Sequence, residues 1–185
     1  MCQPRHFEIK YRINPWMDPD AWAAKSRYLA DAADLQWQTL YDALVTHGAN
    51  VEIIPVMPDL PDLVFTANAA VILDRKALLA RFRHRERRPE EPVFAQALRT
   101  LKHQGALDLV AELPVNLVLE GAGDCIWDKE RSLFWLGYGP RSDLASRHVV
   151  SDVFGVDCVP LELADPRFYH LDTAFCLLPK GEVIY

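Results

Sequence analysis

The sequence predicts a mixed α/β fold that is built from a repeated unit. Three times along the 185 residues, an amphipathic helix pattern ends at a glycine and is followed by apolar runs of strand length. The glycines that end these patterns, at positions 48, 105 and 155, lie 57 and then 50 residues apart. A period of about 50 residues is typical of repeat architectures, in which each unit buries its apolar face against its neighbours. A non-repeating α/β domain whose glycines are spaced by chance is the alternative.

The first round opens with apolar residues in alternation, Phe7, Ile9 and Tyr11, which predict a strand. A helix is then expected over 21–47, because its apolar residues share one face and Gly48 is a favourable stop. Strands or extended segments are expected at 51–56, 64–68 and 71–82.

The second and third rounds follow the same order. A helix is expected over 90–104, with Gly105 behind it. A third helix begins at Ser142, a residue type that favours the N-cap, and ends at Gly155. The expected strands of these rounds are 115–120, 133–136, 156–163, 174–178 and 182–185.

Composition excludes several classes of protein. Hydrophobic residues make up 50% and charged residues 25% of the chain, which is enough apolar material for a packed core. The net charge of −6 argues against a nucleic-acid partner. No apolar run reaches the length of about 20 residues that a membrane span needs. The four scattered cysteines argue against a zinc ribbon or a disulfide scaffold, and favour the reducing cytoplasm.

Polar side chains occupy equivalent places in the three rounds. Asn68, Glu120 and His170 each follow an apolar strand pattern, at intervals of 52 and 50 residues that match the repeat. If the units pack around a common axis, these side chains converge on it. A buried carboxylate orients a neighbouring imidazole and favours its charged form, so Glu120 and His170 are candidates for an acid/base pair.

The segment Glu120-Gly-Ala-Gly-Asp124 has two interpretations. Its glycines let the backbone pass close to a ligand, and Asp124 adds a second acid. The segment does not match the dinucleotide-binding pattern, which needs a third glycine and a following helix. The alternative is an ordinary glycine turn with Glu120 in a salt bridge.

Two further features suggest a ligand with charged ends. His170 and Asp172 share one face of an extended segment, where a carboxylate could hold a guanidinium in bidentate geometry. A metal site and a buried, hydrogen-bonded His–Asp pair are the alternatives. Arg141 is a candidate clamp for a substrate carboxylate, against the alternative of a solvated arginine in a turn. The basic segment 81–88 could supply another clamp or form a charged surface on which His84 is exposed.

Taken together, these segments resemble the pentein superfamily of guanidino-group-modifying enzymes, in the branch of arginine dihydrolases, dimethylargininases and amidinotransferases. The matching segments, in family order, are Ile13-Asn-Pro-Trp-Met-Asp18, Asp62-Leu-Val-Phe-Thr-Ala-Asn68, Arg81-Phe-Arg-His84, Glu86-Arg87, Glu120-Gly-Ala-Gly-Asp124, Gly137-Tyr-Gly-Pro-Arg-Ser142 and Arg167-Phe-Tyr-His-Leu-Asp-Thr173. The resemblance implies a five-bladed α/β propeller of ββαβ-type units around a central active site. About three blades would be present, so residues 1–185 would form a single incomplete catalytic domain without its C-terminal blades.

The resemblance also implies roles for individual residues. His170 would be the general acid/base, and Glu120 its acidic partner on the guanidinium. Asp172 would hold the guanidinium nitrogens. Asn68 stands where deiminases of the superfamily usually have aspartate. The branch that resembles arginine dihydrolases has asparagine at this position, and it converts arginine to ornithine, ammonia and carbon dioxide and does not stop at citrulline. The residues expected to position the amino-acid end of the substrate are Asn14, Arg87 and Arg141. No metal and no organic cofactor is implied.

The implied reaction is covalent: a cysteine thiolate attacks the guanidino carbon of L-arginine, ammonia leaves, and water hydrolyses the thiouronium adduct. The nucleophilic cysteine of the family lies beyond the end of this chain. The position is not filled by Cys2, Cys125, Cys158 or Cys176. We therefore expect the 185-residue chain to be inactive alone, and the missing blades to come from a longer form, a homo-oligomer or a second chain.

Other functions stay open at this point. Dimethylarginine hydrolysis and amidino transfer are the alternatives among enzymes of the same superfamily. A non-catalytic guanidino-binding module would keep Glu120, Arg141 and Asp172 without a nucleophile. A metal-dependent hydrolase that uses His170 and Asp172 is the third alternative.

Overall fold

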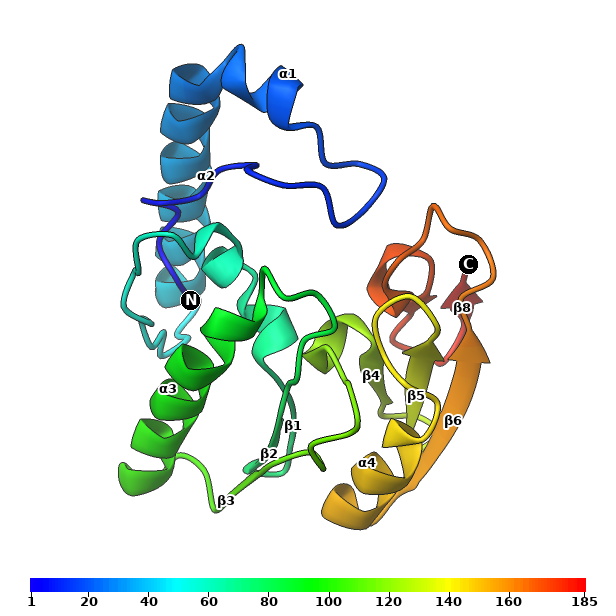
Figure 1. The fold of residues 1–185 in the computed structure, drawn as a ribbon. Coiled ribbons are helices and arrows are strands. Elements are labelled where there is room, and N and C mark those ends of the chain that lie inside the picture. Colours follow the sequence, from blue (N-terminus) through cyan, green and yellow to red (C-terminus); the bar gives the residue numbers. More distant parts are fainter. The chain divides into compact units, whose positions relative to one another are not determined.

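The computed structural model describes residues 1–185 as a mixed α/β structure (Figure 1). The chain divides into two compact units, Met1–Thr66 and Ala67–Tyr185. No helix is both long and apolar enough to cross a membrane. The second unit contains every named strand, and it also contains most of the site that the sequence predicts.

The second unit begins with a three-stranded sheet of order β1-β2-β3. Strand β1 (Ala70–Leu73) pairs antiparallel with β2 (Lys76–Leu79), and β2 pairs parallel with β3 (Leu109–Ala111). Helix α3 (Glu91–His103) supplies the crossover that a parallel pair requires. These elements form one complete ββαβ unit.

A second sheet repeats this arrangement. Strand β4 (Cys125–Asp128) pairs antiparallel with β5 (Leu133–Tyr138), and β5 pairs parallel with β6 (Asp157–Glu162). Helix α4 (Ser146–Phe154) connects them and lies alongside β6 (Figure 1). Gly155 ends α4 with φ 74°, in the left-handed region that favours glycine.

The second unit ends in an antiparallel strand pair. Strand β7 (Cys176–Leu177) pairs with β8 (Val183–Ile184). An antiparallel pair also opens each of the two complete ββαβ units.

The core of the second unit lies where the sheets meet their crossover helices. Phe134, on β5, is almost fully buried, and its ring centroid lies 5.1 Å from those of Trp127 and Phe154. The same cluster contains Leu78 from β2 and Val150 from α4. Residues from both sheets therefore share one apolar core, which fixes the loops at the strand ends.

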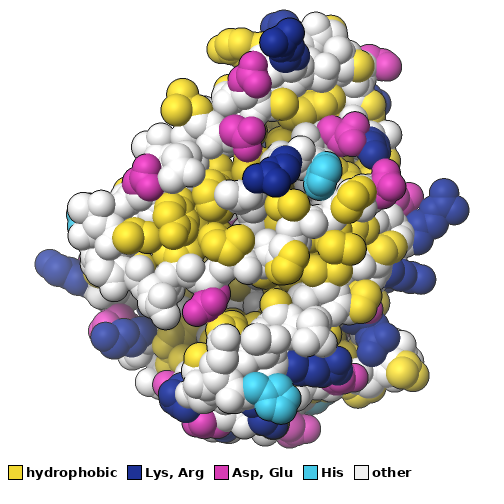
Figure 2. Space-filling view, turned by 90° about the vertical axis from the view of Figure 1, so that its left-hand side faces the viewer, with side chains coloured by type: hydrophobic (Ala, Val, Ile, Leu, Met, Phe, Trp, Pro, Cys, Tyr) yellow, Lys and Arg dark blue, Asp and Glu magenta, His cyan; other side chains and the backbone are white.

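The first unit consists of two helices and irregular segments. The side chain of Asp18 accepts hydrogen bonds from the amides of Asp20 and Ala21 and so caps α1 (Pro19–Ala23). Helix α2 (Ser26–Thr46) buries none of its side chains. Figure 2 shows hydrophobic side chains interspersed with charged ones on one face of the molecule.

Several predicted elements of the first round are wrong. The helix expected over 21–47 is present as α2, but a turn separates its first residues, which lie in α1. The segment 7–11 is not a strand. The segment 51–56 makes only the single bridge between Cys2 and Ile54, because Pro55 cannot donate to a ladder. The segment 64–68 lies in two 3-10 helices, Pro61–Val64 and Thr66–Ala69.

Two later expectations also fail. The segment 115–120 is not a strand: it begins with a turn at Pro114, and only Leu119 bridges to Arg81. The parallel strand of this unit is β3, which the sequence analysis did not predict. Ser142 does not cap the third helix, which begins at Ser146. Its hydroxyl instead makes hydrogen bonds within the polar cluster described below.

Replacing Phe134 with alanine tests the shared core. We expect the free energy of unfolding to fall by about 3–5 kcal/mol, because a large buried ring is lost and a cavity is left. The measurement is chemical denaturation followed by circular dichroism. Val115, which is 86% exposed, provides the control, and Val115→Ala should change the free energy by less than about 0.5 kcal/mol. Equal losses for the two variants would contradict the assignment of Phe134 to the core.

Candidate active site

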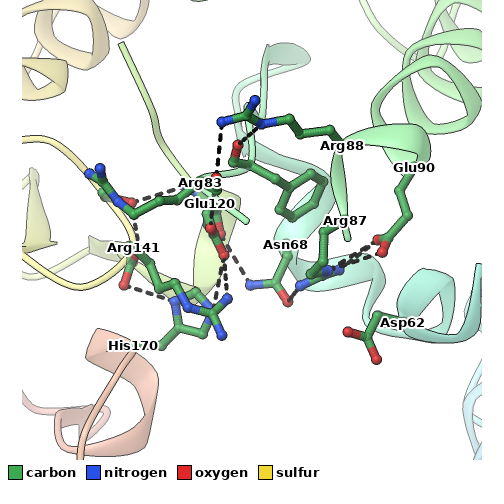
Figure 3. Close-up of polar contacts among 12 residues, drawn as sticks. Asp62, Asn68, Arg83, Arg87, Arg88, Glu90, Glu120, Arg141 and His170 are labelled. Atoms are coloured by element: carbon green, nitrogen blue, oxygen red, sulfur yellow. Dashed lines mark hydrogen bonds and ion pairs between the residues drawn. The ribbon is translucent and has the colours of Figure 1, made fainter. Parts of the chain in front are cut away.

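Asn68, Glu120 and His170, which the repeat places at equivalent positions, lie together in the second unit (Figure 3). Asn68 is in the 3-10 helix Thr66–Ala69, and Glu120 directly precedes the 3-10 helix Gly121–Gly123. His170 directly precedes the 3-10 helix Leu171–Thr173. All three side chains are buried, and Glu120 is 0% exposed. The predicted convergence is therefore present in the structure.

Two glycines allow this close approach. Gly121 has φ +64°, and a Cβ atom there would lie 2.6 Å from the backbone of Asn68. A Cβ atom on Gly123 would lie 2.5 Å from Nδ2 of Asn68 and 3.4 Å from the His170 ring. Only glycine fits positions where backbone and side chains pack this closely. The glycines of the Glu120–Asp124 segment are thus required by neighbouring protein groups.

Glu120 receives hydrogen bonds on both carboxylate oxygens. The amide of Arg83 donates to Oε1 at 3.0 Å, and Nη1 of Arg141 donates to Oε2 at 2.8 Å. Nε2 of His170 lies 3.5 Å from the same Oε2. A fully buried carboxylate needs such partners, because its desolvation costs several kcal/mol. Glu120 is therefore held in place by two donors, with one of its oxygens facing His170.

Asp124 contacts the other side of the His170 ring. Its Oδ1 lies 3.0 Å from Nδ1 of His170 and also accepts the amide of Leu171 at 3.2 Å. Its Oδ2 accepts the hydroxyl of Ser142 at 2.5 Å. The same hydroxyl oxygen accepts the backbone amide of Glu120 at 3.0 Å. His170 thus lies between two buried carboxylates.

Arg87 forms a second buried ion pair beside Asn68. Its guanidinium donates to both carboxylate oxygens of Glu90, at distances of 2.7–3.2 Å, and its Nη1 donates to Oδ1 of Asn68 at 3.1 Å. The guanidinium also lies over the ring of Phe82, 4.3 Å from its centroid. Asn68 is fixed at both ends of its amide, because Nδ2 donates to the carbonyl of Glu120.

The remaining predicted residues lie differently. Asp172 is exposed and accepts no hydrogen bond from a protein group, although the surrounding atoms partly desolvate it. This desolvation is the main cause that raises the pKa of Asp172; the charge of Asp124 acts in the same direction and that of His170 opposes it. Asn14 belongs to the first unit, where its side-chain oxygen accepts the amides of Trp16 and Met17.

Four residues of this site lie or bond differently from what their sequence context predicts. Ser142 was expected to cap a helix, Asp124 was given no role beyond a second acid, and Glu90 was not singled out. The i,i+3 spacing of Arg87 and Glu90 is a signal that could have identified their pair. His84 was expected at the surface but is half-buried. Burial, followed by the positive charge of Arg141, lowers the pKa of His84.

The four cysteines of the chain are free thiols. Cys125 is packed in the core, where burial is the main cause that raises the pKa of its thiol well above the ordinary value. Cys176 is exposed on β7. No cluster of three or more histidine, cysteine, aspartate or glutamate side chains is arranged to hold a metal ion.

Comparison with known proteins identifies relatives along the whole chain. A family model described as N,N dimethylarginine dimethylhydrolase, eukaryotic, matches residues 3–184. A bifunctional arginine dihydrolase/ornithine cyclodeaminase, AgrE from Nostoc sp., is 42% identical over all 185 residues. An N(G),N(G)-dimethylarginine dimethylaminohydrolase from Mycobacterium tuberculosis is 36% identical over the same length. The chain spans 25% of the first relative and 57% of the second.

Solved structures agree with these matches. The N-terminal domain of ArgZ, an arginine dihydrolase from cyanobacteria that was solved with its substrate, is 37% identical to this chain and superimposes with a TM-score of 0.85. That match covers 99% of this chain and 64% of the ArgZ domain. A dimethylarginine dimethylaminohydrolase at 20% identity, with a TM-score of 0.69 over 84% of this chain, supports the fold alone.

Replacing Gly121 with alanine tests the close packing at the site. The matched control is Gly105→Ala, because Gly105 also has a positive φ, +78°, but has open space around its Cβ position. The control loses only the backbone preference, about 1–2 kcal/mol. We expect Gly121→Ala to lose a further 1–3 kcal/mol, roughly, because the new methyl group meets the backbone of Asn68. Equal losses in thermal or chemical denaturation would contradict the close approach.

Proposed function

The chain belongs to the N,N dimethylarginine dimethylhydrolase family, and on this premise we propose that the protein is a hydrolase acting on the guanidino carbon of L-arginine. The observation that carries the proposal is the buried His170 between Glu120 and Asp124, with Asn68 beside it. The arginine dihydrolases ArgZ and AgrE, at 37–42% identity, support L-arginine as the substrate.

The site residues take roles that follow from their chemistry. His170 transfers protons as the general acid/base. Glu120 and Asp172 provide negative charge for the substrate guanidinium. Asn68 contacts the guanidinium or the ureido group that replaces it, because an amide both donates and accepts hydrogen bonds.

The amino-acid end of the substrate is assigned to Arg87, Arg141 and Asn14. Both arginines are paired with glutamates in this ligand-free structure. Arg141 would therefore exchange its bond to Glu120 for one to the substrate carboxylate, while the substrate guanidinium takes the vacated place on Glu120.

The reaction that we propose proceeds through a covalent adduct. A cysteine thiolate attacks the guanidino carbon, the C–N bond breaks, and ammonia leaves with a proton from His170. His170 then takes a proton from water, which attacks the thiouronium carbon and breaks the C–S bond. A second round gives the overall conversion of arginine and two waters to ornithine, two ammonia molecules and carbon dioxide. We assign the thiolate to a cysteine outside residues 1–185, as the family resemblance implies. Burial makes Cys125 favour its neutral thiol.

Membership of this family also supports proposals about the complete fold and about the cellular location of the protein. The two complete ββαβ units and the third strand pair support a five-bladed propeller of which about three blades lie in residues 1–185, as one incomplete catalytic domain. The remaining blades would come from further segments of a longer protein, from a second copy or from another chain. Scattered free cysteines support a cytoplasmic location.

Dimethylarginine hydrolysis is the second candidate function. The description of the family model and the Mycobacterium tuberculosis relative favour it. Products distinguish the two functions, because dimethylarginine hydrolysis releases dimethylamine and citrulline and the dihydrolase releases ammonia and ornithine. A guanidino-binding protein without activity would bind arginine and release neither amine.

The function is tested with the natural full-length protein and its His170→Ala variant. L-Arginine and dimethylarginine are supplied in parallel, and ornithine, citrulline, ammonia and dimethylamine are quantified. We expect ornithine and ammonia from arginine, and a loss of turnover of at least about 10²-fold in the variant because the proton-transfer group is absent. His103→Ala, at an exposed position, is the control and should retain full turnover. Arginine turnover that survives in His170→Ala would overturn the assignment.

Replacing Asn68 with aspartate tests product selection. A carboxylate holds a cationic guanidinium strongly but offers no donor to the neutral ureido group of citrulline. We expect Asn68→Asp to shift the products from ornithine toward citrulline. Asn116→Asp introduces the same change at an exposed position and should leave the product ratio unaltered. Unchanged ornithine release from Asn68→Asp would count against this residue as the selector.

A further inference from the structure

We propose that Asp124 is the positioning residue of His170 and that Ser142 holds Asp124 in place. In this assignment Asp124 keeps a proton on Nδ1 of the imidazole. Nε2 is then the nitrogen that exchanges protons, on the side that faces Glu120. The proposal deepens the function proposed above, because it divides between two carboxylates a task that the sequence analysis gave to Glu120 alone.

The hydrogen bonds of Asp124 determine where the protons are. Asp124 is 0% exposed, and its three partners are the amide of Leu171, the hydroxyl of Ser142 and Nδ1 of His170. The Ser142 oxygen already accepts the amide of Glu120, so its own hydrogen is available for Asp124. The carboxylate of Asp124 thus accepts from two donors, and the geometry makes Nδ1 of His170, at 3.0 Å, the third donor.

The charges of the site lead to the same assignment. Arg87 pairs with Glu90, and Arg141 pairs with Glu120. Asp124 instead contacts Nδ1 of His170, at 3.0 Å. A buried carboxylate without a cation is costly, so Asp124 favours the charged imidazolium when His170 acts as an acid.

The two ring nitrogens of His170 therefore differ in their surroundings. Nδ1 makes the shorter contact, 3.0 Å to Asp124, whereas Nε2 lies 3.5 Å from Glu120. The carboxylate of Glu120 is already engaged by Arg83 and Arg141. A histidine that is anchored through one nitrogen presents the other in a fixed tautomer, which is the arrangement that an acid/base catalyst needs.

Ser142 connects the anchor to the rest of the site. Its single hydroxyl bonds both the backbone of Glu120 and the side chain of Asp124. The uncharged Ser142 side chain thus links the carboxylate of Asp124 to the backbone of Glu120. Loss of this hydroxyl would loosen Asp124 and leave the buried amide of Glu120 without its acceptor.

The test compares Asp124→Asn with Asp128→Asn in the natural full-length protein. Asp128 is a matched control: it is buried on β4, accepts three hydrogen bonds from Arg131 and Trp135, and has no contact with His170. For Asp124→Asn we expect kcat for arginine to fall on the order of 10²- to 10⁴-fold, the range expected when the orienting carboxylate of a catalytic histidine is lost. KM should change little. Asp128→Asn should lower the thermal midpoint and leave kcat near that of the unchanged protein.

Ser142→Ala and Ser146→Ala form a second matched pair. Ser146 is equally buried, and its hydroxyl donates to the carbonyl of Val118, two residues before Glu120. Ser142→Ala should lower kcat, and Ser146→Ala should lower only stability. Equal kcat values within each of the two pairs would overturn the proposal, as would an effect of Asp124→Asn on KM alone.

Nitrogen NMR of histidine-labelled full-length protein gives a readout that does not depend on turnover. The His170 signals are assigned by their loss in His170→Asn. The proposal requires that neutral His170 carries its proton on Nδ1; a proton on Nε2 would overturn it even in an active enzyme. The Nδ1 tautomer in a protein that releases no product from arginine would instead refute the proposed function and leave the positioning role standing.

Discussion

The burial of carboxylates, each with its own partner, is the constraint on which the site depends. Glu90, Glu120 and Asp124 are all 0% exposed, and a buried carboxylate that loses its partner costs several kcal/mol. Their partners come from different segments: Arg87 precedes α3, Arg141 precedes α4, and His170 follows β6. These segments must therefore reach their places together, and the carboxylates tie the loops of the two ββαβ units to each other.

The two sheets hold the loops in the positions that this pairing of carboxylates requires. Phe134 and Leu78 belong to different sheets but to the same apolar cluster, so the loops at the strand ends are held by one core. Glycine at 121 and 123 then lets the Glu120–Asp124 segment pass within contact distance of Asn68 and His170. The apolar core fixes positions to the accuracy of side-chain packing, and the hydrogen bonds within the site fix the orientation of each polar group.

Periodicity in the sequence was sufficient to find the site, and local propensity was insufficient to describe it. The spacing of Asn68, Glu120 and His170 follows the repeat, so their convergence could be predicted without a structure. The strand predicted at 115–120 is absent because a turn begins at Pro114. Strand β3 was not predicted, because three residues are too few for a recognisable alternation of apolar and polar side chains. Ser142 was misjudged because a serine before a helix has the composition of an N-cap, and only tertiary contacts show that its hydroxyl binds Asp124 instead.

The charge count of the ligand-free site bears on how a cationic substrate would be received. Two buried arginines, Arg87 and Arg141, are paired with Glu90 and Glu120, and Asp124 contacts His170. A guanidinium that enters adds a positive charge and needs a carboxylate that is not already held by one of these arginines. Asp172 lies two residues after His170, is exposed, and accepts no hydrogen bond from the protein. An exposed carboxylate beside His170 is available to a cationic ligand, which is a physical argument for the role proposed for Asp172 beside Glu120.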